Sequence, residues 1–110
     1  MTIKTMPKYK TSIVDNGRKC CYLCGTSHQL EIHHIYSGSN RKNSTKYGLV
    51  VTLCASCHRG VNGVHNNYDK MLYLRKVGQM AFEKNYPSIK FEKIFHRNYL
   101  ENDDDRDDNK

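Results

Sequence analysis

Two Cys-x-x-Cys pairs are the strongest chemical signal in this sequence. Cys21 and Cys24 form the first pair, and Cys54 and Cys57 form the second. Each pair offers two thiolates, and four thiolates complete the tetrahedral shell of a structural zinc ion. A chain of 110 residues has a small core, so a bound ion would also stabilise it. We therefore predict a zinc site at these four cysteines, with Cys20 left over as a fifth that could replace Cys21 by a one-residue shift.

Two adjacent histidines lie between the cysteine pairs. His33 and His34 fall within Leu30–Tyr36, a stretch rich in β-forming residues, and neighbouring side chains on a strand point to opposite faces. Imidazole binds divalent metal ions and also acts as a general base near neutral pH. We therefore predict that one histidine faces the following helix and binds a metal ion there. The other would face outward, toward a water molecule and a phosphodiester.

Two more histidines follow the second cysteine pair. His58 comes directly after Cys57, and His65 would lie on the same side of a helix if that segment stays helical. Gly60 and Gly63 lie between them and weaken such a helix. Either histidine could complete the second metal site, and His58 could instead be a spare zinc ligand.

Plainer structural roles are open to several of these residues. His33 and His34 could pack within the strand or join the zinc shell, and His65 could cap or pack. Glu31 could orient a histidine that binds a metal, or it could form a surface salt bridge. The remaining two histidines, His28 and His96, are expected to be ordinary surface residues.

The distribution of charge indicates a polyanionic partner. The net charge of the chain is +7, but residues 101–110 hold six acidic and two basic residues, so that residues 1–100 carry +11. Such an excess suits nucleic acid, because each neutralised phosphate releases condensed counterions. The basic residues that we expect to contact phosphates are Arg41, Lys42, Lys46 and Arg59.

The sequence argues against a membrane partner. It contains no apolar run of transmembrane length and no N-terminal segment of the signal-peptide type. Cysteines in a chain without a secretory signal favour thiolate metal ligation over disulfides. We therefore expect a cytoplasmic protein.

The predicted elements place these residues around a hairpin. A second strand over Leu49–Leu53 would pair with the first, and the polar stretch Ser37–Lys46 between them is predicted to be a loop. Thr11–Val14 is β-prone, and Asp15–Gly17 is predicted to turn the chain back as a hairpin into the first cysteine pair. A short or broken helix should start near Ala55.

The second half of the chain is predicted to be helical. Asn67 is a candidate N-cap for a helix that Pro87 stops, and Ser88 is a candidate cap for a final helix. The longer helix should point Lys70, Arg75 and Lys76 to solvent. Its inner stripe, at a period of about 3.6 residues, is predicted to be formed by Tyr68, Met71, Leu72, Val77, Met80, Ala81 and Lys84. Residues 1–10 are predicted to be a basic flexible arm, residues 11–100 the folded domain and residues 101–110 an acidic disordered tail.

In this order and spacing, the motifs resemble the HNH, or ββα-metal, nuclease family. The resemblance rests on the two cysteine pairs, on Glu31-Ile-His-His34-Ile and on Gly48-Leu-Val-Val-Thr-Leu-Cys54-x-x-Cys57-His58. The resemblance covers about residues 20–66, and a looser likeness extends through the predicted helices as far as Leu100. It is greatest to small phage and prophage HNH endonucleases with a four-cysteine zinc site. It implies an α+β fold in which a zinc-stapled ββα-metal unit carries C-terminal helices packed on it.

The resemblance also implies roles for the histidines. His34 would be the general base, and His33 would bind the catalytic divalent ion with His58 or His65. That ion would be magnesium or manganese, with nickel or zinc as alternatives. The family often has asparagine just before the second strand, where Tyr47-Gly48 stands here, so Asn40 or Asn43 could take its role of orienting the base.

We therefore expect a metal-dependent DNA endonuclease encoded by a phage or prophage. Its partners would be double-stranded or branched DNA and phage or host recombination proteins. The alternative is a zinc-ribbon module that binds nucleic acid without cutting it, within a phage recombination or packaging complex. RNA cleavage is a third reading, since no residue is identified that reads a 2′-hydroxyl.

Overall fold

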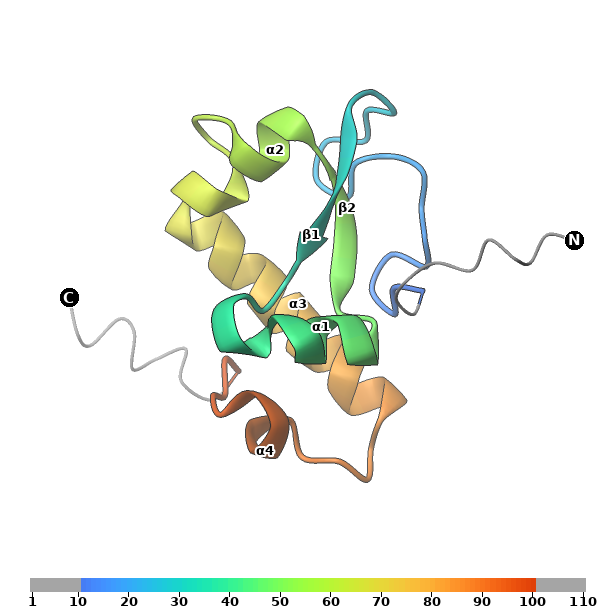
Figure 1. Cartoon of the computed structure of the whole chain (residues 1–110), viewed down its shortest axis with the longest axis vertical. Helices are drawn as coiled ribbons and strands as arrows, with labels where there is room; N and C mark the ends of the chain where they lie inside the picture. Colours follow the sequence, from blue (N-terminus) through green and yellow to red (C-terminus); the bar gives the residue numbers. More distant parts are fainter. Residues whose placement is uncertain (1–10, 101–110) are drawn as a thin grey trace, which may run out of the picture.

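A two-stranded antiparallel sheet forms the centre of the computed structural model, which describes residues 11–100. Strand β1 (Leu30–His34) pairs with β2 (Val50–Cys54) so that His33 lies opposite Val51 and His34 opposite Val50 (Figure 1). The paired strands were predicted from their β-forming residues, and the structure confirms them. All residues of β2 are buried, whereas β1 buries only His33 fully. The pairing of the strands thus holds His33 on the inner side of the sheet.

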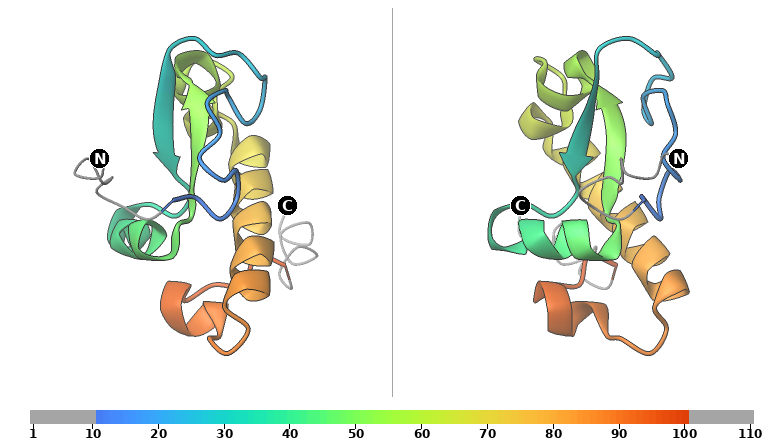
Figure 2. Two further views of the ribbon diagram at one scale, coloured as in Figure 1. Left: turned by 90° about the vertical axis from the view of Figure 1, so that its right-hand side faces the viewer. Right: turned by 45° about the vertical axis from the view of Figure 1, so that its right-hand side comes forward.

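Helices surround the hairpin and make the fold α+β, as predicted. Figure 2 shows the long helix α3 running beside the hairpin, with α2 near one end of the strands and α1 near the other. The helical elements in chain order are η2 (Gly38–Asn40), α1 (Arg41–Tyr47), α2 (Ala55–Arg59), η3 (Val64–Asn66), α3 (Tyr68–Asn85) and α4 (Phe91–Phe95). No helix within residues 11–100 has the length and apolar character needed to cross a bilayer. The predicted arm and tail lie outside the described residues.

The connection between the strands is helical, so the prediction of a loop over Ser37–Lys46 was wrong. Helix α1 shows no apolar period because the residues that it buries are Ser44 and Tyr47. The Ser44 hydroxyl accepts a hydrogen bond from the Tyr36 amide at 2.9 Å and donates one to the Tyr36 carbonyl at 2.8 Å. Gly48, at φ +73°, ends the helix in the left-handed conformation that glycine adopts without strain.

The predicted strand over Thr11–Val14 is also absent. The turn at Asp15–Gly17 exists, with positive φ at Asn16 and Gly17, but the chain before it lies along the free edge of β2 as irregular backbone. Ser12 donates to the carbonyl of Val50, and the Asp15 carboxylate accepts from the Thr52 amide at 2.8 Å. Side chains here make the hydrogen bonds that a third strand would otherwise make.

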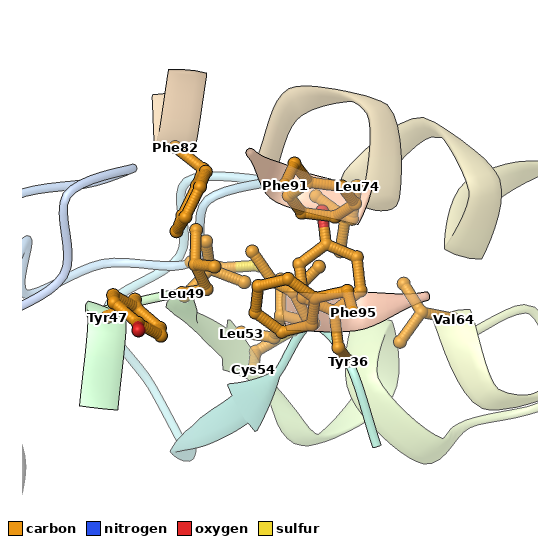
Figure 3. Packing of buried hydrophobic residues seen from close by; sticks show 13 residues of the cluster. Tyr36, Tyr47, Leu49, Leu53, Cys54, Val64, Leu74, Phe82, Phe91 and Phe95 are labelled. Carbon is orange, nitrogen blue, oxygen red and sulfur yellow. The ribbon is translucent and has the colours of Figure 1, made fainter. Parts of the chain in front are cut away.

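The core lies between the hairpin and α3, α1 and α4. Figure 3 shows the aromatic rings that fill it, with the Tyr36 ring 4.6 Å from that of Phe95 and 5.3 Å from that of Phe91, centroid to centroid. Helix α3 buries Leu74, Gly78, Gln79 and Phe82. The predicted stripe was therefore misplaced around the helix, and Met80 is 55% exposed.

The ends of α3 follow their predicted signals, whereas the start of α4 does not. The Asn67 side chain caps α3 by accepting from the Lys70 amide at 3.0 Å, and α3 ends before Pro87. Helix α4 begins after Lys90 without a side-chain cap, so Ser88 is not its cap. The chain then returns to α3, where the buried amide of Gln79 accepts a hydrogen bond from the Tyr99 backbone at 2.7 Å.

Candidate metal centres

Four cysteines meet at one end of the hairpin, as their spacing predicted. The sulfur atoms of Cys21, Cys24, Cys54 and Cys57 all lie within 4.8 Å of one another, and none is in a disulfide. Cys24 and Cys54 place their sulfurs 3.7 Å apart. Four sulfurs at about 2.3 Å from a tetrahedral zinc ion would be separated by about 3.8 Å. This group could therefore hold a metal ion, and its geometry is compatible with zinc.

The backbone around each cysteine pair is arranged to accept negative charge on sulfur. The Cys24 amide points at Cys21 Sγ and the Cys57 amide at Cys54 Sγ, each at 3.4 Å. Gly25, at φ +83°, makes the tight bend that follows the first pair. The Tyr22 amide donates to the Thr52 carbonyl at 2.8 Å, which ties this bend to β2. The cysteines are thus held by the fold itself.

The thiols differ widely in acidity because they are so close. Burial raises the pKa of Cys21, but hydrogen bonds from the backbone of Cys24, Cys54 and Leu23 outweigh it and lower that pKa to about 6. Burial and the neighbouring thiols raise the pKa of Cys57 to about 12. One thiolate therefore opposes the ionisation of the next. A divalent cation among the sulfurs would relieve that repulsion, which is a physical reason for this cluster to bind one.

Three histidines form a second cluster beside the first. Nitrogen atoms of His33, His58 and His65, which come from β1, α2 and η3, all lie within 4.8 Å of one another. The Nε2 atoms of His58 and His65 are 3.1 Å apart, and the His33 ring centroid lies 5.2 Å from each of the other two. Ligand nitrogens around a tetrahedral zinc ion would be about 3.4 Å apart. Both His58 and His65 therefore join His33, and neither has to be chosen over the other.

His33 is prepared to bind a cation. It is 3% exposed, and its Nε2 atom is buried without a hydrogen-bond partner among the described residues. Burial first, and then the charges of His58 and His65, lower the pKa of His33 to about 3, so its ring is neutral at pH 7. A buried ring nitrogen with a free lone pair and no partner is costly unless it coordinates something.

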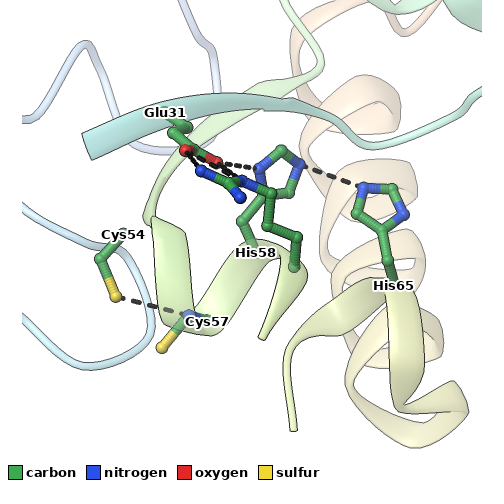
Figure 4. A network of polar contacts seen from close by, with 6 residues as sticks. Glu31, Cys54, Cys57, His58 and His65 are labelled. Atoms are coloured by element: carbon green, nitrogen blue, oxygen red, sulfur yellow. Dashed lines mark hydrogen bonds and ion pairs between the residues drawn. The ribbon is translucent and has the colours of Figure 1, made fainter. Parts of the chain in front are cut away.

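Glu31 fixes the orientation of His58. Its Oε1 lies 2.7 Å from His58 Nδ1, and Arg59 binds the same carboxylate through Nε and Nη2. Figure 4 shows the His58 ring between Glu31 on one side and His65 on the other. Hydrogen bonds from Arg59 and His58 lower the pKa of Glu31 to about 2, so the carboxylate is charged at neutral pH. Glu31 thus both forms a salt bridge and turns His58 Nε2 toward the cluster.

His34 stands apart from the three clustered histidines. It follows His33 on β1 and is half-buried, and it does not belong to the cluster. Burial lowers its pKa, and the charges of Arg41 and His58 lower it further. The predicted alternation of the two histidines is therefore present, with His33 turned inward. Asn40 and Asn43 instead donate to the carbonyls of Phe95 and Ile94 in α4, at 3.2 and 3.4 Å.

The basic residues predicted to contact phosphates lie in two places. Arg41 and Lys42 are exposed on α1 and line a surface hollow of about 480 Å³ with Gly38 and Thr45. Lys46, also exposed on α1, lies over the Tyr47 ring. Arg59 is exposed on α2 but is engaged by Glu31. Of the four residues, the three on α1 form no ion pair within residues 11–100, and they lie in a stretch that was predicted to be a loop.

Arg75 of α3 was predicted to face solvent and does not. It is half-buried near the histidine cluster, where its charge contributes to lowering the pKa of His33 and His65. No motif in the sequence marks this residue. Only the correct rotation of α3 about its axis, with Leu74 and Gly78 inside, would have placed it.

The two clusters are adjacent but chemically different. Cys57 belongs to the first and His58 to the second, and both lie in α2. Four sulfurs form a closed shell, whereas three imidazoles leave one position of a tetrahedral ion open, which is the usual arrangement of catalytic rather than structural zinc. Comparison of the chain with protein-family models, curated proteins and solved structures gives no match. The chemistry of both clusters is therefore inferred from their donor atoms and geometry.

Proposed function

We propose that this protein is a metal-dependent endonuclease that hydrolyses DNA phosphodiesters, built as an HNH-type ββα-metal unit around a structural zinc ion. The observation that carries this proposal is the convergence of His33, His58 and His65 from a strand, a helix and a 3₁₀ turn, with His34 next to them on β1. The order β1, β2, α2 matches the unit that the sequence motifs resemble.

His33, His58 and His65 would hold the catalytic ion. Three imidazoles and no carboxylate of the described residues make up this donor set, which suits nickel or zinc better than magnesium. When bound, such an ion would stabilise the negative charge that builds on the phosphate and the leaving oxygen. Since His65 is exposed and His58 half-buried, substrate would approach from their side rather than through His33.

The chain supplies the proton transfer and the binding of neighbouring phosphates. His34 is the proposed general base, taking a proton from the attacking water through its ring. Its lowered pKa keeps the ring neutral, and thus able to accept a proton, at neutral pH. Arg41, Lys42 and Lys46 on α1 would bind phosphates on either side of the cleaved bond. Glu31 keeps His58 in the orientation that the ion needs.

The choice of DNA, double-stranded or branched, and a phage origin with recombination proteins as partners rest on the resemblance of the motifs. A cytoplasmic setting belongs to the same proposal, supported by five cysteines without a disulfide in residues 11–100. The competing proposal, a zinc module that only binds nucleic acid, would require His34 to have no effect beyond binding.

A plasmid-nicking assay with purified zinc-loaded protein tests the proposal. Supercoiled plasmid is incubated with added nickel, manganese, magnesium or zinc, and conversion to the nicked form is followed with time. We expect cutting by the wild type, and a loss of about 10²-fold or more for His34→Ala with duplex affinity retained. His28→Ala removes an exposed histidine outside both clusters and should cut like the wild type.

Two results would contradict the proposal. Binding of duplex DNA without nicking under every metal tested would favour the module that binds and does not cut. Equal cutting by wild type and His34→Ala would remove His34 as the base and point to a contaminating nuclease. Repeating the assay with a duplex RNA of the same length separates the two substrates.

A further inference from the structure

Arg75 of α3 lies near the histidine cluster, close enough for its charge to act on His33 and His65. At Gly78, helix α3 closely approaches the two residues that follow β1, since an added Cβ would meet Tyr36 Oη at 2.7 Å and Ile35 Cγ2 at 3.3 Å. Arg75 is three residues before Gly78, so it lies one turn along the same side of the helix. His33 precedes Ile35 by two residues and shares its inward face. This packing brings Arg75 beside His33.

The backbone and ring contacts of Arg75 hold it in place, yet its Nε has no hydrogen-bond partner among the described residues. Its backbone carbonyl accepts a hydrogen bond from Tyr36 Oη at 2.6 Å, and its guanidinium carbon lies 5.8 Å from the centroid of the Tyr99 ring. Arginine has five N–H donors, but within residues 11–100 the Arg75 side chain forms no hydrogen bond or ion pair, and its Nε is buried. A positioned guanidinium that has no acidic partner within residues 11–100 is suited to binding an anion from solution.

The charges around the histidine cluster also favour a bound anion. The charged groups that act most strongly on the rings of His33 and His65 are all positive, namely the other histidines and Arg75. Glu31, the acid nearest in this network, is already bound by His58 and Arg59. A divalent ion on the three histidines would add further positive charge. An anion bound between that ion and Arg75 would neutralise both.

We propose that Arg75 binds the phosphate at the cleaved bond, so that the guanidinium and the ion on His33, His58 and His65 hold the same phosphate group. This inference rests on the proposed function and adds a substrate contact from outside the ββα unit. The planar fork of arginine binds two phosphate oxygens at once, which the single ammonium of lysine cannot do. The Tyr99 ring would hold the fork in that plane.

The test measures binding separately from cutting. His34→Ala serves as the background, so that a fluorescently labelled 20-base-pair duplex stays intact, and its affinity is measured by anisotropy at several salt concentrations with and without nickel. Arg75→Gln keeps the backbone bond to Tyr36 and removes the charge. Arg75→Lys keeps the charge and removes the fork. Lys84→Gln, at an exposed position near the end of α3, is the matched control for loss of one positive charge.

We expect Arg75→Gln to weaken nickel-dependent duplex binding about tenfold and to lower the salt slope by about one, as loss of one phosphate contact should. Arg75→Lys should recover part of the affinity, and Lys84→Gln should change it less than about twofold. In the protein that keeps His34, Arg75→Gln should also lower the rate of DNA cleavage at saturating DNA about 10²-fold relative to the wild type.

The two proposals fail in different ways. If Arg75→Gln binds and cuts like Lys84→Gln while the wild type cuts, the inference about Arg75 is wrong and the endonuclease remains. If no protein cuts but Arg75→Gln still loses nickel-dependent affinity and slope, the phosphate contact stands and the nuclease does not. Thermal melting and nickel affinity of Arg75→Gln are measured alongside. A loss of either in step with duplex binding would assign Arg75 a structural role and overturn the inference.

Discussion

The Nδ1 atom of His58 lies 2.7 Å from Oε1 of Glu31, a residue of the neighbouring strand. This contact decides which nitrogen of His58 faces the cluster, because only Nε2 remains to meet His65. The carboxylate is in turn held by Arg59 in a two-pronged ion pair. One acidic side chain on β1 therefore sets the geometry of a helix residue on which the proposed ion depends.

Loss of Glu31 should weaken the histidine site without affecting the cysteine site. With zinc on the cysteines, we expect Glu31→Ala to lower nickel affinity 10- to 100-fold, roughly the effect of removing an orienting partner from a metal-binding histidine. Isothermal titration of nickel measures it. Arg59→Gln keeps the Glu31–His58 contact and should stay within about fivefold of wild type, since Arg59 is exposed. Equal affinities for wild type and Glu31→Ala would mean that His58 needs no orientation.

Loss of a cysteine ligand should unfold the domain. Cys54→Ser should bind almost no zinc, and the loss of metal stabilisation, about 3 kcal/mol or more, should lower Tm by roughly 12–24 °C in a domain of this size. Metal analysis and circular dichroism measure both. Cys20→Ser is the control, because Cys20 lies outside the four-cysteine group and should keep both its zinc and its Tm. A Cys54→Ser protein that binds no zinc but melts at the same temperature as the wild type would contradict a stabilising zinc site.

Cleavage should depend on pH through His34. The ring accepts a proton only when neutral, so the rate should rise with pH as the ring loses its own proton. Because burial and then the charges of Arg41 and His58 lower its pKa, the rising limb should lie below the ordinary histidine value of about 6.5, with little change above neutrality. Arg41→Gln should shift the limb to higher pH.

The control for this shift is Lys42→Gln, which also removes a charge from α1. It should lower kcat/KM but leave the position of the limb unchanged, because Lys42 is not among the charges that lower the pKa of His34. Profiles of log(kcat/KM) for the three proteins are compared. If Arg41→Gln and Lys42→Gln gave the same limb as wild type, the limb would belong to a group other than His34.

The close approach of α3 to Tyr36, just after β1, should be sensitive to a single methyl group. Alanine at position 78 would place its Cβ 2.7 Å from Tyr36 Oη, and Tyr36 is held in the core by its neighbours. We expect Gly78→Ala to destabilise the protein by about 1–3 kcal/mol, although alanine favours helix. Urea unfolding measures this change. Lys84→Ala, at an exposed position, should stay within about 0.5 kcal/mol.

The sequence was sufficient to predict the features that depend on residues close together in the chain, namely the cysteine pairs, the alternation along β1 and the limits of α3. The spacing of Cys21 with Cys24 and of Cys54 with Cys57 was sufficient to bring four sulfurs together, because each pair needs only one tight bend. Strand alternation was sufficient to predict that only one of His33 and His34 turns inward, and the family resemblance assigned metal binding to His33, the one that does. Asn67 and Pro87 marked the limits of α3 because a cap and a missing amide act on their immediate neighbours.

Features that depend on tertiary packing could not be predicted in the same way. Helix α1 buries a serine and a tyrosine, so no apolar period reveals it. Helix α3 buries Gly78 and Gln79 and exposes Met80, which is the reverse of what hydrophobicity favours. Arg75 was misplaced for that reason. Gly78 is needed because Tyr36 leaves no space for a Cβ there, and Gln79 is buried because it accepts a hydrogen bond from the Tyr99 amide. Tyr36 and Tyr99 are both distant from α3 in sequence, so no local pattern reveals these contacts.

Helix α2 contains only five residues, and within it Cys57 and His58 are consecutive. A segment so short has no independent stability, so its shape depends on whatever binds its sulfur. On the proposed assignment, the two ions would load in sequence, the cysteine ion first, because Glu31 can orient His58 only while α2 keeps its shape. Supply of one metal would then govern whether a second, chemically different metal can be used.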